Sequence, residues 1–187
     1  EEAVNHYNQI MADMDAEEYM LSQSTAAQRT YGSGQVQIKS GTFRGQLSNS
    51  STVSSGEPSE IRIRLTCQSE IPPPSIGFLI RDRFGQDIFG SNTHYIDSAP
   101  SIAVGEEIEI VFSLPMNLSP GKYTITVAAH SENDHLENCY HWCDNLINFE
   151  VAGYKTPIFS GVAYIPTQVQ IVRGQELTTT EIIKKNV

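Results

Sequence analysis

Regular alternation of apolar and polar residues constrains this chain more than any other feature of its sequence. The segment EIRIRLTCQ carries apolar side chains at every second position and polar ones between them: Ile61, Ile63, Leu65 and Cys67 against Arg62, Arg64 and Thr66. A period of two places alternate side chains on opposite faces of an extended strand, so that one face can pack on a core. The pattern therefore predicts a half-buried β-strand.

Several further segments have the same period and are separated by residues that favour turns. They are QVQIKSGTFR, SIGFLIRD, EEIEIVFSL, KYTITVAA and NLINFEVAG, whereas LSNSSTVSSGE indicates a serine-rich loop or a weak edge strand. About seven to nine short strands, with no alternation of strands and helices, are typical of two packed antiparallel sheets. We predict an all-β fold, an immunoglobulin-like antiparallel β-sandwich, over residues 34–173.

The two ends of the chain have a different character. Apolar residues recur at helical spacing near the start, which predicts a short amphipathic helix over residues 2–11: Ala3, Tyr7, Ile10 and Met14. Residues 1–33 are expected to be this helix followed by a polar linker. GVAYIPTQVQIV predicts a last extended segment, and residues 174–187 are expected to form a C-terminal tail.

Composition excludes some classes of partner. The 187 residues carry a net charge of −10, so nucleic acid and anionic membrane surfaces are repelled on average. No run approaches the roughly 20 apolar residues that span a bilayer. The three cysteines cannot all pair within one chain, which indicates a reducing compartment.

The segment RDRFGQD lies between two apolar runs and is predicted to be the corner of a hairpin. Gly85 stands where a turn with a bulge needs a positive φ, and Asp82 can accept hydrogen bonds from the backbone of the turn. Turn geometry does not require Arg81 or Arg83. Both are expected to face away from the core and are candidates for binding a ligand.

The segment CYHWCD predicts a carbohydrate site. In a regular strand Cys139, His141, Cys143 and Asn145 face the core, while Tyr140, Trp142 and Asp144 point outward. Aromatic rings stack on the C–H faces of sugars, and nearby Asp and Arg side chains bind the hydroxyls. The alternative is that Trp142, the only tryptophan, is a core residue at one end of the sandwich, and a bulge would reverse the facing.

The same region contains residue types that bind metals or act as nucleophiles: His130, Asp134, His135, Glu137, Cys139, His141 and Cys143. Their spacing differs from the usual zinc-site patterns, and the sequence does not show a thiol in contact with a base. Phosphate loops, dinucleotide fingerprints and nucleophile elbows are absent. We therefore expect no enzymatic activity, no metal and no cofactor.

Several stretches, in order, resemble the C-terminal domain of Wzt-type ATP-binding subunits of O-antigen polysaccharide ABC exporters. They are VQIKSGTFR, SIGFLIRDRFGQDIFGSNT, LSPGKYTITVAA and CYHWCDNLINFEV, over about residues 34–172, and EAVNHYNQIM resembles the helix that follows the ATPase domain. The resemblance implies that residues 1–33 come from a removed ATPase domain. It also implies a homodimer in which a C-terminal strand within residues 158–172 is exchanged between protomers.

The leading hypothesis is a non-catalytic domain that recognises a lipid-linked O-antigen polysaccharide, at its modified non-reducing end, to license export. The resemblance implies a cytoplasmic location at the inner face of the bacterial inner membrane, with contact to the transmembrane subunit through the missing ATPase domain. The candidate carbohydrate-binding residues are Tyr140, Trp142, Asp144, Arg81 and Arg62. The alternatives are a purely structural dimerisation or docking domain, or a metal-dependent hydrolase.

Overall fold

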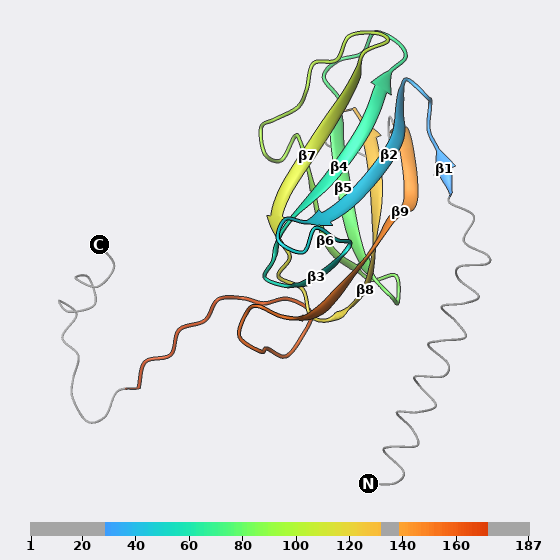
Figure 1. The fold of residues 1–187 in the computed structure, drawn as a ribbon. Helices are drawn as coiled ribbons and strands as arrows, with labels where there is room; N and C mark the ends of the chain where they lie inside the picture. Colours follow the sequence, from blue (N-terminus) through green and yellow to red (C-terminus); the bar gives the residue numbers. More distant parts are fainter. Residues whose placement is uncertain (1–28, 132–138, 172–187) are drawn as a thin grey trace, which may run out of the picture.

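The protein is a sandwich of two β-sheets (Figure 1). The computed structural model describes residues 29–131 and 139–171. The larger sheet has the order β1-β9-β8-β5-β6, with β3 also paired to β9, and the smaller sheet has the order β2-β4-β7. In chain order the strands are β1 (Thr30–Tyr31), β2 (Val36–Gly45), β3 (Thr52–Ser55), β4 (Pro58–Cys67), β5 (Ser75–Asp82), β6 (Asp87–Asn92), β7 (Glu107–Pro115), β8 (Gly121–His130) and β9 (Cys139–Tyr154).

The strand predictions are largely confirmed. All the pairings are antiparallel except that of β3 with β9, which is parallel. The segment that indicated a loop or weak edge forms the short strand β3. The immunoglobulin-like sandwich predicted from the period of two is therefore present, with one parallel pair that the pattern did not show.

The core lies between the sheets and is closed by aromatic pairs that reach across it. Phe43 of β2 stacks on Phe149 of β9 with ring centroids 4.2 Å apart, and Phe78 of β5 meets Phe112 of β7 edge to face at 4.9 Å. Such contacts between inner faces hold two sheets about 10 Å apart. The predicted inward residues of β4 are all buried: Ile61, Ile63, Leu65 and Cys67. The alternation of apolar and polar residues therefore predicted the buried face of β4 correctly.

The β5–β6 hairpin has the turn chemistry predicted for RDRFG. Oδ1 of Asp82 accepts hydrogen bonds from the backbone N–H groups of Phe84 and Gln86, each at 2.9 Å. Gly85 has a φ of 77°, a backbone conformation that residues with a Cβ rarely adopt. The roles of Asp82 and Gly85 in the turn are confirmed.

Strand β9 departs from regular alternation at two places. At each of them a side chain points in a different direction from the one predicted. His130 pairs with Cys139 while Ala129 pairs with His141, so Tyr140 is an extra residue opposite β8. Tyr140 is only 5% exposed, and the prediction that it points outward beside Trp142 is wrong. A bulge bends the strand and redirects its side chains, which accounts for the burial.

The second irregularity lies between Cys143 and Ile147, which pair with Val127 and Ile125. β9 therefore has extra residues here, and Asn145 adopts a φ of 47°. Asn145 is exposed instead of facing the core, because the bulge turns its side chain outward. Its backbone N–H donates to Oγ1 of Thr126 at 3.1 Å, which replaces the hydrogen bond that the regular ladder would have supplied.

After β9 the chain first forms a loop at one end of the sandwich, and the last described residues, up to 171, extend away from it (Figure 1). A bridge between Leu118 and Ala163 joins the loop to the body of the domain. Five large apolar side chains of residues 155–171 are exposed: Ile158, Val162, Ile165, Val169 and Ile171. The predicted helix at 2–11 and the tail at 174–187 lie outside the described residues. Among those that are described, no helix is long and apolar enough to span a membrane.

Candidate functional site

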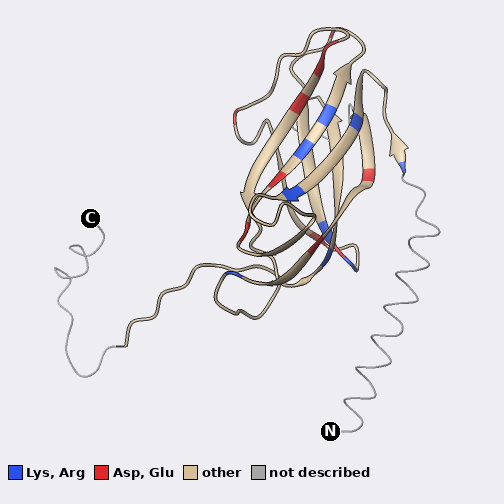
Figure 2. Ribbon diagram, in the orientation of Figure 1, with Lys and Arg blue, Asp and Glu red and all other residues tan. Residues whose placement is uncertain are grey.

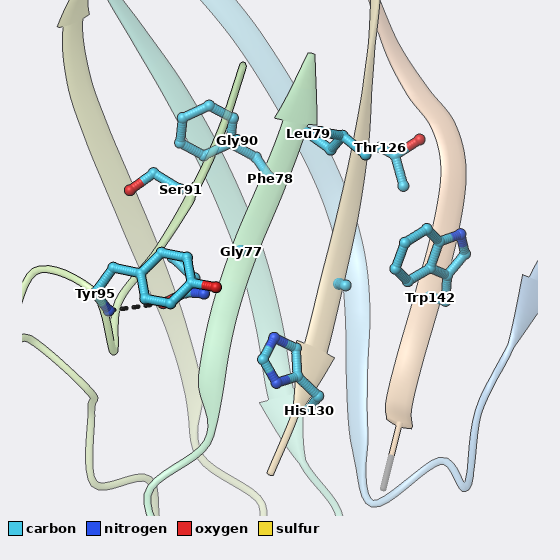
Figure 3. Close-up of a pocket in the computed structure, with 11 residues that line it drawn as sticks. Gly77, Phe78, Leu79, Gly90, Ser91, Tyr95, Thr126, His130 and Trp142 are labelled. Carbon is cyan, nitrogen blue, oxygen red and sulfur yellow. Dashed lines mark hydrogen bonds between the residues drawn. The ribbon is translucent and has the colours of Figure 1, made fainter. Parts of the chain in front are cut away.

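A pocket of about 220 Å³ opens on the outer face of the larger sheet (Figure 3). Its floor follows one row of cross-strand partners, in which Gly77 of β5 pairs with Ala128 of β8, and Ala128 pairs with Trp142 of β9. On the other side Gly77 pairs with Asn92 of β6. Neighbouring strands lie about 4.8 Å apart, so this row is roughly 14 Å long and has its two smallest residues in the middle. The result is a trough with Trp142 at one end.

The floor of the trough depends on close contact between β5 and β6. A Cβ at Gly77 would lie 3.0 Å from Cβ of Asn92 and 3.2 Å from the carbonyl oxygen of Ser91. A Cβ at Gly90 would lie 3.1 Å from both Leu79 Cδ1 and the carbonyl oxygen of Phe78. Glycine at these positions lets the backbones approach and leaves peptide groups as a flat floor.

Aromatic rings stand on both sides of this floor. Trp142 and Tyr95 lie on opposite sides of Gly77, and the imidazole of His130 lies at one end (Figure 3). Tyr95 follows β6, where its backbone N–H donates to Oδ1 of the buried Asn92 at 2.7 Å. This hydrogen bond holds the start of the loop beside the pocket. The pocket lining contains no Asp, Glu, Lys or Arg.

Trp142 is held in place by two contacts. Its Nε1 donates a hydrogen bond to Oδ1 of Asp144 at 3.0 Å, and its ring stacks on Tyr31 with centroids 5.9 Å apart and an angle of 17° between planes. Tyr31 lies in β1, where it pairs with Trp142, and is 55% exposed. Trp142 is therefore half-buried on the outer face of the sheet, and the alternative that it closes the core is wrong.

Asp144 accepts hydrogen bonds from three side chains at a single oxygen. Besides Trp142, Nη1 of Arg81 donates to Oδ1 at 3.1 Å and Oγ1 of Thr126 donates at 3.2 Å. Nε of Arg81 also donates to Oδ1 of Asp87 at 2.7 Å. The structure thus brings together three of the predicted site residues, Arg81, Trp142 and Asp144, at the edge of the pocket.

Two predicted residues do not join this cluster. Tyr140 is buried, as described above. Arg62 lies on β4 of the other sheet, where it forms ion pairs with Glu60 at 2.6 Å and with Glu109 of β7 at 2.8 Å. Figure 2 shows these basic positions on β4 beside the acidic ones on β7. Outward residues of the two sheets face opposite directions, so Arg62 and Trp142 cannot contact the same sugar unit.

Sequence reasoning missed Tyr31 and Tyr95. Tyr31 falls in the segment predicted to be a polar linker, and Tyr95 lies in a loop. Neither position has a periodic pattern around it. Only the pairing of β1 with β9 places Tyr31 on Trp142, and only the pairing of β6 with β5 places Tyr95 across the pocket floor from it. Burial raises the pKa of Tyr31 above its usual value, and the charges of Cys139 and Asp144 raise it further.

The environment of the cysteines near this site disfavours the thiolate form that a nucleophile needs. Burial raises the pKa values of the Cys139 and Cys143 thiols, and burial lowers the pKa of His141. Sγ of Cys143 lies 3.7 Å from Nδ1 of His141, but Nδ1 already accepts a hydrogen bond from the backbone N–H of Ile38 at 2.8 Å. His141 thus links the two sheets as a neutral acceptor, and a thiolate–imidazolium pair is disfavoured.

The metal candidates are only partly described. Asp134, His135 and Glu137 lie outside the described residues. Within residues 29–131 and 139–171, no group of three His, Cys, Asp or Glu side chains is arranged to hold a metal ion.

These features define an all-β domain of the immunoglobulin-like sandwich class, with an aromatic pocket on one outer face. Residues 27–165 match the family model of the Wzt C-terminal domain, which is well over half of the chain. The chain belongs to the Wzt C-terminal domain family, and it therefore has a role in an O-antigen ABC exporter. The predicted resemblance is confirmed.

The crystal structure of the C-terminal domain of Wzt has a similar fold, with a TM-score of 0.66 and 14% identity over 78% of this chain and 89% of that chain. A CARDB domain from Pyrococcus furiosus matches with a TM-score of 0.34 and 15% identity, over 64% of this chain and 95% of its own. A β-glucosidase from Listeria innocua in complex with glucose matches with a TM-score of 0.37 and 14% identity, over 68% of this chain and 16% of its own. The last two scores are too low to define a common fold. The comparison with curated proteins found no match.

Proposed function

We propose that the outer face of the larger sheet binds the O-antigen polysaccharide carried by the exporter, at the modified non-reducing end of the lipid-linked chain. The observation that carries this proposal is the position of Trp142 at one end of a trough floored by Gly77 and Ala128. Recognition of the finished chain end at this site licenses its export.

The chemistry of the trough suits one sugar unit. A volume of about 220 Å³ is below the roughly 300–1,000 Å³ of pockets that enclose drug-sized ligands. Trp142 and Tyr95 offer ring faces to the C–H surface of a pyranose, and Asn92 and His130 offer polar groups to its hydroxyls. Because no charged side chain lines the pocket, it favours an uncharged terminal unit.

Binding of the isolated O-polysaccharide, with and without its terminal modification, tests the proposal. The chain is expected to bind the modified polymer, and Trp142→Ala is expected to abolish binding while the domain stays folded. Arg62→Ala is the matched control, since Arg62 lies on the other sheet and its loss leaves this face intact. Absence of binding to any form of the polymer by the wild-type chain would overturn the proposal.

The family assignment also supports an assembly. In this proposal the chain works at the cytoplasmic face of the bacterial inner membrane, joined to the transmembrane subunit through an ATPase domain of the same subunit. Two copies form a homodimer by exchanging the segment after β9. The exposed apolar side chains of residues 155–171 support the exchange, because a segment with this composition is stabilised when a partner covers it.

The same exposed segment favours a second candidate function, in which the domain serves only for dimerisation or docking within the exporter. A measurement of glycan binding distinguishes the two candidate functions. A purely structural domain forms the dimer and captures no glycan, whereas the leading proposal requires both properties in the same chain.

A further inference from the structure

A second and larger cavity, of about 730 Å³, opens at the other end of the same outer face. Its walls come from β3, the β5–β6 hairpin, β8 and β9. Its lining combines hydroxyl and amide side chains with aromatic rings, and includes Thr52, Thr124, Asn145, Asn148, Phe84 and Tyr123. None of the roles described so far uses this cavity.

The two cavities follow one another along the same strands. On β8, Lys122 and Thr124 line the second cavity, while Thr126, Ala128 and His130 line the first. Positions two apart on a strand share a face and are about 7 Å apart, so the two linings form one continuous row. On β5, Arg81 lines the second cavity and Leu79 lines the first. The Arg81–Asp144 ion pair therefore lies at the junction between them.

The charges of the second cavity balance. It is lined by equal numbers of basic and acidic side chains: Arg81, Arg83 and Lys122 against Asp82, Asp87 and Glu150. Two of the carboxylates already have structural partners, because Asp82 accepts the backbone N–H groups of the hairpin turn and Asp87 pairs with Arg81. An acidic or phosphorylated ligand gains little from such a lining, whereas a hydroxyl-rich neutral one can use its amides and hydroxyls.

Only the backbone of Phe84 takes part in the turn that carries it, through its hydrogen bond to Asp82. The hairpin geometry depends on Asp82 and Gly85, yet the Phe84 side chain is 65% exposed at the rim of the cavity. The guanidinium carbon of Arg83 lies 4.6 Å from its ring centroid, which orients the ring. An exposed, oriented ring beside amide side chains repeats the arrangement of Trp142 beside its polar neighbours.

One amide of this cavity is held in position by a side chain of β8. Asn148 pairs across the sheet with Thr124, and Oγ1 of Thr124 donates to Oδ1 of Asn145 at 3.0 Å. Asn145 is turned outward by the second bulge of β9. The irregularity of β9 therefore supplies polar groups to the second cavity.

From this continuity we infer that the second cavity is a second sugar subsite, which takes the units following the terminal one in the same polysaccharide chain. Phe84 stacks on one of these units, and Asn145 and Asn148 bind its hydroxyls. The inference rests on the proposed function of the first pocket. It specifies that the internal repeat next to the chain end is an uncharged, hydroxyl-rich sugar, and that affinity depends on chain length.

Fragments of the O-polysaccharide test the inference. The probes are the non-reducing terminal unit alone and longer fragments that keep this end, prepared from the polymer of the bacterium that encodes the chain. The wild-type chain is expected to bind the longer fragments about tenfold more tightly than the terminal unit, a gain of the size that one aromatic contact supplies. Phe84→Ala and Asn148→Ala are each expected to remove most of this gain and to leave binding of the terminal unit unchanged.

Val104→Ala is the matched control, since it also shortens an exposed apolar side chain but lies in the loop before β7. Thermal unfolding of each variant checks that the domain remains intact. Equal affinity of the wild-type chain for short and long fragments overturns the second subsite while the proposed function stands, and so does an equal loss for both lengths in Phe84→Ala. Absence of binding at every length overturns the proposed function itself.

Discussion

Nη1 of Arg81 lies 3.1 Å from Oδ1 of Asp144, and this ion pair joins β5 to β9 across the intervening strand β8. Thr126 of β8 lies beneath the pair and bonds to both partners, at 3.3 Å to Arg81 and 3.2 Å to Asp144. Both charged side chains are about a quarter exposed. The pair therefore sits on the sheet surface between the two cavities, where it orients the indole of Trp142 through the shared carboxylate oxygen.

The first prediction concerns this ion pair. A double-mutant cycle with Arg81→Ala and Asp144→Ala is expected to give a coupling of about 0.2–1 kcal/mol in the free energy of unfolding, as for partly exposed pairs. Each single variant is expected to weaken binding of the O-polysaccharide, because each loosens the support of Trp142. Chemical denaturation and glycan titration measure the two effects. Unchanged affinity in Asp144→Ala would show that the indole does not need this hydrogen bond.

The second prediction uses Trp142 as a reporter. It is the only tryptophan of the chain, so its intrinsic fluorescence reports on this one site. Sugar units that cover the indole are expected to shift its emission to shorter wavelength as the modified O-polysaccharide is added. Tyr31→Ala is expected to change the emission of the free protein, since it removes the stacked ring. Emission that stays constant while an independent assay shows saturation would place the ligand elsewhere.

The third prediction concerns the floor of the first pocket. Gly77→Ala is expected to lower the free energy of unfolding by about 1–3 kcal/mol, the usual cost of overpacking, because the new methyl group presses on Asn92 and Ser91. It is also expected to weaken glycan binding. Gly121→Ala is the control, since its Cβ would meet Tyr123 no closer than 3.5 Å, an ordinary contact. Equal melting temperatures for the two variants would contradict the prediction.

The fourth prediction concerns acid stability. The carboxylate of Glu57, only 1% exposed, accepts backbone hydrogen bonds from Leu47, Ser48 and Ser54. Burial acts to raise the pKa of Glu57, but the hydrogen bonds from Ser48, Ser54 and Leu47 outweigh it, and the pKa lies below its usual value. The stabilisation is therefore present above the pKa of the unfolded chain and is lost as the pH falls through the lowered folded pKa.

Glu57→Gln is expected to cost about 1–3 kcal/mol at neutral pH, since it leaves buried donors poorly matched. The difference from wild type is expected to shrink as the pH falls into the range where Glu57 itself becomes protonated. Urea unfolding at a series of pH values measures this, with the exposed Glu107→Gln as the control. A difference that stays constant down to low pH would exclude the carboxylate charge as its source.

Prediction from sequence succeeded where one local rule decided the outcome. The inward face of β4 and the hairpin turn at Asp82 and Gly85 depend on residues close together in the chain, and both are as expected. The same rule was used to predict which side chains of β9 face the core, and that prediction is wrong for Tyr140 and Asn145. Bulges there depend on how β9 pairs with β8, which no pattern within β9 itself reveals.

By itself the sequence determined that two sheets pack around one core, because alternating side chains force one face of each strand inward. It also singled out Trp142, Asp144 and Arg81 by their chemistry. Only the tertiary structure decided that these three meet, since Arg81 and Asp144 are 63 residues apart and are joined by the strand order β9-β8-β5. It likewise moved Arg62 to the opposite face, buried Tyr140, and brought Tyr31 and Tyr95 beside the pocket, because distant strand pairing and bulges set the position of each side chain.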